Sequence, residues 1–252
     1  MILMRILPGV LKELVKHVPT VLFQVVEWSE LSAELPKLSR RVLQKEGYQE
    51  LFDKQKEFLK PLHVTLSSEP LTSPDKMTKA ASERWLQIYF AQLLSPHGIF
   101  LDLRPQSYQM KDDELLWHPT GLWTKFSPQF QEGLMDIYDG FYLQDEALYR
   151  GGLKKIGLIS DEWSDEDKNK LAELFKAQFG SSIDTEMNFD LEHFKASIIK
   201  ITNFLLTKKV TITKDFLYLG IYLVTLYSNL EHSPDKFAVK NIYLDVKKKL
   251  TK

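Results

Sequence analysis

Apolar residues return every three or four positions along most of this chain, and strict alternation of apolar and polar residues is nearly absent. A period of about 3.6 residues places apolar side chains on one face of a helix, whereas a strand needs a period of two. The pattern therefore predicts a mostly α-helical protein. The expected helices cover residues 29–43, divided at Pro36, and then 46–59, 73–94, 165–179, 191–206 and 214–230.

Local signals place several helix ends and one break. In Ser73-Pro74 and Ser127-Pro128 the serine can cap a helix, and the proline suits its first turn, where a missing backbone donor costs nothing. Gly151-Gly152 predicts an interruption of the chain before residues 153–159. A last helical piece begins at Ser233-Pro234.

The β signal is confined to the middle of the chain. Residues 65–72 are rich in Ser, Thr and Pro and predict a loop. Short apolar pieces around Pro105 and Asp112-Asp113, between residues 99 and 117, predict a loop and one small β-hairpin. We expect an N-terminal helical segment at residues 1–62 and a helical domain at residues 63–252, packed as one unit.

Composition narrows the class of protein. With 44% hydrophobic residues, a chain of 252 residues can bury a core within the single-domain range. The 33 basic and 34 acidic side chains give a net charge of -1, which favours no nucleic-acid partner. The lack of cysteine excludes disulfides, thiolate metal sites and a cysteine nucleophile, and it suits a reducing compartment. We therefore expect a cytoplasmic protein.

Membrane signals are local. Residues 1–8 are apolar but have no long apolar core before a small-residue cleavage site, so we expect no signal peptide. Residues 216–230 fall short of the roughly 20 residues that cross a bilayer and predict a buried helix. A peripheral membrane contact is a further hypothesis. It rests on Arg5, Lys12 and Lys16 among apolar neighbours, and on Lys247-Lys248-Lys249, although the first group can pack on its own domain and the second can be a solvated helix end.

Three motifs follow one another between residues 98 and 134. Residues 98–107 read Gly-Ile-Phe-Leu-Asp-Leu-Arg-Pro-Gln-Ser, residues 117–121 read Trp-His-Pro-Thr-Gly, and residues 126–134 read Phe-Ser-Pro-Gln-Phe-Gln-Glu-Gly-Leu. They resemble the catalytic loop Gly-Phe-Phe-His-Ala-Asp-Pro-His-Pro-Gly-Asn, the turn Leu-Leu-Asp-Phe-Gly and the segment Leu-Ser-Pro-Glu-Phe-Arg-Arg-Ala-Leu of the UbiB/AarF family of atypical kinases. The resemblance covers about residues 80–239 and implies the helical large lobe of a kinase.

The small lobe has no counterpart. Tyr48 and Phe58 match a helix of the family, but Leu51 stands where that helix carries the Glu that pairs with a strand lysine. Neither a Gly-rich phosphate loop nor the family's Lys-x-Gly-Gln signature is present in the sequence. The resemblance therefore implies a large lobe alone, preceded by helices.

The residues that would bind metal are replaced. A kinase holds ATP through magnesium bound by an Asn of the catalytic loop and the Asp of the following turn. Ser107 and Pro119 stand at those positions, and neither replaces a carboxylate or carboxamide ligand. Asp102 matches the catalytic base, which needs an activated phosphate nearby; otherwise Asp102 pairs with Arg104 or caps a turn. We predict no phosphoryl transfer and no cofactor.

Other candidate residues surround the loop. Arg104, Ser107 and His118 are candidates for ligand binding, Arg104 because it could hold an anion. His97 and His118 bracket the loop, but no third ligand has recognisable spacing, so we predict no metal site. Nearby aromatic residues could line a hydrophobic ligand cavity, although such residues more often fill a core. They are Trp117, Trp123, Phe126, Phe130, Tyr138, Phe141 and Tyr142.

Three functional hypotheses follow. The first is a non-catalytic, UbiB-like pseudokinase that acts as an accessory or binding module for a protein partner or a lipid or quinone-like ligand, because the family acts in quinone and isoprenoid-lipid metabolism. The second is a divergent ATP-dependent phosphotransferase or ATPase, with Asp102 as base and metal held by Asp112, Asp113 or Glu114. In the third the likeness is accidental, and the chain is a helical hydrophobic-ligand-binding or interaction domain.

Overall fold

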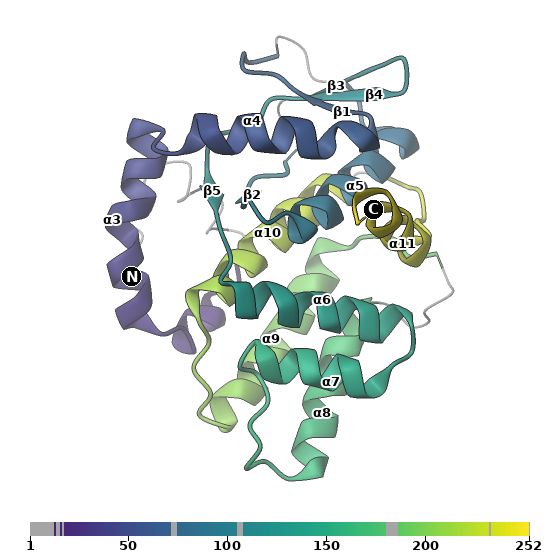
Figure 1. Ribbon diagram of the computed structural model, residues 1–252. Coiled ribbons are helices and arrows are strands. Elements are labelled where there is room, and N and C mark those ends of the chain that lie inside the picture. Colours follow the sequence, from purple (N-terminus) through teal and green to yellow (C-terminus); the bar gives the residue numbers. More distant parts are fainter. Residues whose placement is uncertain are drawn as a thin grey trace.

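The computed structural model describes residues 13, 16, 18–71, 75–104, 108–179, 186–231 and 233–251. Figure 1 shows a mostly helical protein with a few short strands, which confirms the predicted mostly α fold class. Buried side chains from the helices and from both small sheets belong to one hydrophobic cluster. Helix α10 (Lys214–Leu230) runs through the middle of the molecule and most of its residues are buried, as its uncharged sequence predicted.

The N-terminal part borders the loop that resembles a catalytic loop. A short 3₁₀ helix, η1 (Thr20–Gln24), precedes α3 (Trp28–Gln44), α4 (Tyr48–Leu59) and the 3₁₀ turn η2 (Lys60–Leu62). The predicted division at Pro36 is wrong, because α3 continues through it. Leu31 and Leu38 are buried on either side of the proline, so one packed face holds the helix together across the missing hydrogen bond.

The strands form two small sheets. The predicted hairpin is confirmed as β3 (Tyr108–Lys111) and β4 (Glu114–Trp117), joined by Asp112 and Asp113 at φ 48° and 66°, the left-handed backbone that two-residue hairpin turns require. It is not the only β structure. Strand β1 (Val64–Leu66) pairs in parallel with β4, and β2 (Ile99–Phe100) pairs antiparallel with β5 (Trp123–Thr124).

The loop predicted at residues 65–72 therefore begins too early. Val64 and Leu66 are buried while Thr65 between them is half-buried, which is the alternation of a strand. The pattern covers three residues and was too short to outweigh the Ser and Thr that follow it.

Helix α5 (Lys79–Leu94) starts later than predicted. Its N-cap is Thr78, whose hydroxyl accepts the Ala81 N–H at 3.2 Å. Ser73 and Pro74, the predicted start, lie outside the described residues. Asp75 precedes the helix and its carboxylate accepts the Met110 N–H of β3 at 2.6 Å, so this acidic residue joins the sheet instead of the first helical turn.

Helices α6 (Pro128–Tyr142) and α7 (Glu146–Lys155) pack very closely, and glycines make this possible. The predicted interruption at Gly151-Gly152 is wrong, because α7 runs through both. A Cβ on Gly152 would lie 2.5 Å from the Gly133 carbonyl oxygen of α6, so only glycine allows the two backbones this approach. Ser127 occupies the predicted N-cap of α6, but its side chain makes no cap hydrogen bond.

The C-terminal helices agree well with the periodicity except the last, which begins at Val239 and not at the predicted Ser233-Pro234, because Phe237 pairs with Met187 in an isolated β-bridge. They are α8 (Asp165–Lys176) with the 3₁₀ turn η3 (Ala177–Phe179), α9 (Leu191–Thr207), α10, and α11 (Val239–Leu250). Within the described part of the chain, no helix combines the length and the apolar character that crossing a bilayer demands.

Candidate functional site

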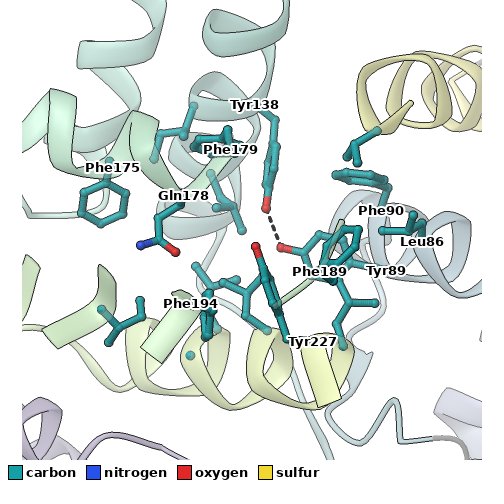
Figure 2. A pocket seen from close by; sticks show the side chains of 18 of the residues that line it. Leu86, Tyr89, Phe90, Tyr138, Phe175, Gln178, Phe179, Phe189, Phe194 and Tyr227 are labelled. Carbon is teal, nitrogen blue, oxygen red and sulfur yellow. Dashed lines mark hydrogen bonds between the residues drawn. The ribbon is translucent and has the colours of Figure 1, made fainter. Parts of the chain in front are cut away.

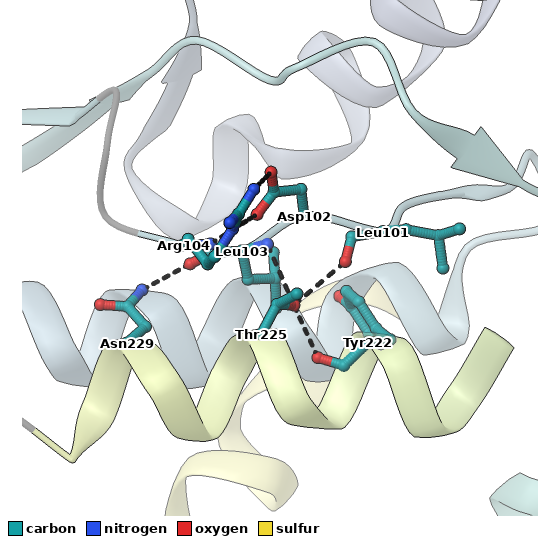
Figure 3. Close-up of polar contacts among 7 residues, drawn as sticks. All are labelled: Leu101, Asp102, Leu103, Arg104, Tyr222, Thr225 and Asn229. Atoms are coloured by element: carbon teal, nitrogen blue, oxygen red, sulfur yellow. Dashed lines mark hydrogen bonds and ion pairs between the residues drawn. The ribbon is translucent and has the colours of Figure 1, made fainter. Parts of the chain in front are cut away.

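Helix α10 holds the backbone of the loop that follows β2. The Thr225 hydroxyl accepts the Leu103 N–H at 3.2 Å and lies 3.0 Å from the Leu101 carbonyl oxygen. One turn further along, the Asn229 side chain donates to the Leu103 carbonyl at 2.7 Å. Figure 3 shows these contacts from one face of α10, which fix the loop on both sides of Asp102.

Asp102 is buried and both of its carboxylate oxygens are used. Oδ1 accepts Nε of Arg104 at 2.8 Å and the Arg104 backbone N–H at 3.1 Å, and Oδ2 accepts Nη2 at 2.8 Å. The hydrogen bond to Asp102 is the main cause that raises the pKa of Arg104, with a smaller contribution from Glu13. The structure thus has the pairing that the sequence offered as the alternative to a catalytic base.

The two histidines that bracket the loop have separate partners. Nδ1 of His118 lies 2.9 Å from the carbonyl oxygen of Ser67, just after β1. His97 meets the ring of Phe58 edge-on at 6.4 Å, and burial lowers its pKa, with smaller effects from Lys54 and Lys125. Ser107, the third ligand-binding candidate, lies outside the described residues.

The acidic residues of the hairpin are engaged in structural contacts. Asp113 pairs with Arg84 of α5 at 3.0 Å, and Glu114 accepts the hydroxyl of Thr65 in β1. Across the residues that the structure describes, no three His, Asp or Glu side chains gather in a way that could hold a metal ion.

Helix α4 closes the other side of the loop. Gln55, fully buried, donates to the Ser95 hydroxyl at 2.8 Å and to the Gly98 carbonyl at 2.5 Å. The Tyr48 hydroxyl donates to the Pro119 carbonyl at 3.2 Å. Leu51 is buried between these two residues, so the position that carries a Glu in the family faces the core here.

The aromatic residues near the loop divide into two groups. Trp117 is buried against Trp85 and Phe100, with ring centroids 5.3 and 5.6 Å away, and fills the core. Tyr138 and Tyr142 instead line a cavity, together with side chains from α5, α8, α9 and α10. Of the aromatic residues named from the sequence, Tyr138 and Tyr142 thus line a cavity, whereas Trp117 fills the core.

The cavity measures about 90 Å³, and all the empty space among its lining side chains, open solvent included, is about 900 Å³. Figure 2 shows the hydroxyls of Tyr89, Tyr138 and Tyr227 turned towards one another inside it, with Gln178 among the lining side chains. Sequence reasoning missed Tyr89, Gln178 and Tyr227. They come from three separate elements, and only the fold brings them together.

No protein-family model matches the chain, and no curated protein is significantly similar to it in sequence. The family resemblance of residues 98–134 therefore remains a prediction.

Proposed function

We propose that the protein is a non-catalytic, UbiB-like large lobe that acts as an accessory or binding module. One observation carries the proposal: the Asp102 carboxylate is held through both oxygens by Arg104. A general base must have an oxygen free to meet the reacting hydroxyl. Both oxygens of Asp102 instead hold Arg104, which supports a structural role in the loop.

The arrangement around the loop supports the kinase-like part of the proposal. The hairpin β3–β4 lies between residues 98–107 and residues 117–121, where the resemblance requires one. Helix α4, which carries the matched Tyr48, packs against both segments through Gln55 and Tyr48. The order of helix, loop, hairpin and turn is thus the order that a degenerate large lobe would keep.

The same region offers little to a triphosphate. Pro119 has no side-chain ligand and presents its carbonyl oxygen to Tyr48. Of the three acids proposed to supply metal ligands in the alternative hypothesis, Asp112, Asp113 and Glu114, the last two bond to Arg84 and Thr65 respectively. Magnesium needs several oxygen ligands in near-octahedral geometry, so acids held elsewhere do not suit it.

The biological setting follows from the resemblance alone. The UbiB/AarF family acts in quinone and isoprenoid-lipid metabolism, and we place this module there as part of the proposal. It would contribute binding to a protein partner or a lipid-like ligand, without phosphoryl transfer.

Thermal unfolding with nucleotide tests the proposal. A ligand that binds only the folded protein raises the melting temperature. We expect the same melting temperature with ATP and excess magnesium or manganese as with ATP and EDTA. A metal-dependent rise would overturn the proposal, because it would require a bridging cation in a site that the named residues do not build.

A further inference from the structure

The cavity between α5, α6, η3 and α10 has an almost entirely apolar wall. Aromatic and aliphatic side chains such as Phe90, Phe194 and Leu226 form most of it. An apolar cavity of about 150 Å³ in another protein stays dry and binds benzene. At about 90 Å³ this cavity is smaller, and it is partly open to solvent. A slender chain that lies partly in the opening suits this size.

Hydrogen-bond donors face this apolar space. The hydroxyl oxygens of Tyr89 and Tyr138 lie 2.5 Å apart, and only one of their two protons can lie between them. The other proton needs an acceptor. Burial raises the pKa of Tyr89, Tyr138 and Tyr227, so all three are neutral donors at physiological pH.

Gln178 adds a donor that lacks a partner. Its amide nitrogen is buried, and no described residue accepts a hydrogen bond from it. A buried N–H without a partner is unfavourable, and a ligand with an acceptor would recover that free energy. The cavity therefore has tyrosine hydroxyl donors from α5 and α6, and Gln178 of η3 adds an amide without a described partner to its lining.

Charge decides which polar group fits. Among the described residues that line the cavity, none is Lys, Arg, His, Asp or Glu. A carboxylate would be buried without a counter-charge, and burying an unpaired ion is strongly unfavourable. A carbonyl oxygen accepts hydrogen bonds without carrying charge and meets no such penalty.

We propose that this cavity binds a slender neutral lipid, with an apolar chain and one carbonyl-type oxygen that accepts hydrogen bonds from the tyrosine hydroxyls. The proposal rests on the cavity alone and does not require the kinase resemblance. The nucleotide melting experiment therefore tests the proposed function and does not test the cavity.

A fluorescent probe gives a direct test. N-phenyl-1-naphthylamine is neutral and brightens in apolar surroundings, and we expect it to bind the full-length protein. We expect 2-decanone to displace it, and decanoate at pH 8 to require at least about a tenfold higher concentration because its charge would be buried. Absence of probe binding, or equal displacement by the ketone and the carboxylate, would overturn the proposal.

Neighbouring residues on α9 provide a matched pair of variants. Ile198 lines the cavity, whereas Ile199 is 40% exposed and does not. We expect Ile198→Trp to fill the space and weaken probe binding by at least about tenfold, and Ile199→Trp to bind as the wild type does. Circular dichroism checks that both fold.

A second blocking variant guards against misfolding of the first. Leu223 lines the cavity from α10 and is only partly buried, so Leu223→Trp places less strain on the core. We expect it too to weaken probe binding. Wild-type affinity in a folded Ile198→Trp or Leu223→Trp protein would place the probe elsewhere and reject the cavity as the site.

Discussion

Helix α10 separates two regions that use polar groups in opposite ways. On one face, Thr225 and Asn229 bond to the backbone of the loop around Asp102. On the opposite face, Leu223 and Tyr227 border the cavity. Residues four apart share a helix face, so the first pair faces the loop and the second pair faces the cavity.

The difference lies in what each polar group contacts. At the loop, the side chains of Gln92 and Asn229 each leave one amide atom without a partner among the described residues, but the other atom bonds to backbone. At the cavity, the buried amide nitrogen of Gln178 has no partner among the described residues, and one tyrosine proton is left without an acceptor. Polar groups that bond to the backbone indicate a structural role, and polar groups that face a cavity indicate a binding role.

The largest expected effect tests the structural role of Asp102. Asp102→Ala leaves the partly buried guanidinium of Arg104 and its backbone N–H without their acceptor. Removing one partner of a buried pair costs about 3 kcal/mol of unfolding free energy. Urea denaturation of the wild type and the variant measures it.

A double variant controls for the loss of charge itself. Asp102→Leu combined with Arg104→Met removes both partners, and we expect it to lie within about 1 kcal/mol of the wild type. If Asp102→Ala were as stable as the wild type, the pair of Asp102 and Arg104 would not stabilise the loop. The structural role assigned to the polar groups at the loop would then be wrong.

A smaller effect separates the two faces of α10. Thr225→Val keeps the shape of the side chain but removes the hydroxyl that bonds the loop. The Leu103 N–H is left buried without an acceptor, so we expect a loss of about 1–2 kcal/mol in urea denaturation. Binding of N-phenyl-1-naphthylamine should not change. A stability loss accompanied by lost probe binding would show that the two faces are not independent.

The sequence predicted the helices well where local signals decide them. Periodicity located α8, α9 and α10, and the Asp112-Asp113 turn located the hairpin. Wrong predictions share a cause: at Pro36 and Gly151-Gly152, tertiary packing outweighs the local preference of the residue. A breaking residue is therefore a weak signal when buried residues flank it.

The same distinction applies to the two sites. Asp102 and Arg104 are two positions apart, so their pairing could be foreseen from the sequence. Tyr89, Gln178 and Tyr227 belong to α5, η3 and α10, and no pattern links them. Their meeting depends on how three elements pack, which the periodicity of each one does not specify.

At the cavity, we expect replacement of Gln178 to raise the free energy of unfolding. Gln178→Leu replaces an amide whose nitrogen is buried without a described partner by an apolar side chain of similar size. We expect the unfolding free energy to rise by up to about 1 kcal/mol, because an uncompensated donor is removed. The variant should still bind N-phenyl-1-naphthylamine, and 2-decanone should displace the probe as it does from the wild type. A loss of stability would mean that the amide is satisfied in the folded protein.

The smallest effect concerns the edge of the loop region, where burial lowers the pKa of His97. The unfolded chain, with a histidine pKa of about 6.5, then binds the proton at higher pH than the folded protein does. The contribution of His97 to stability is fully present above about pH 6.5 and declines as the pH falls towards the folded pKa. Between about pH 7.5 and 5.5, the wild type should therefore lose more unfolding free energy than His97→Gln, in which the other histidines are unchanged. Urea denaturation at both pH values measures the difference, and the NMR titration of His97 reports its folded pKa directly. Equal losses in the two proteins would mean that folding does not lower the pKa of His97. The region in which burial and hydrogen bonds hold the loop would then end at Gly98.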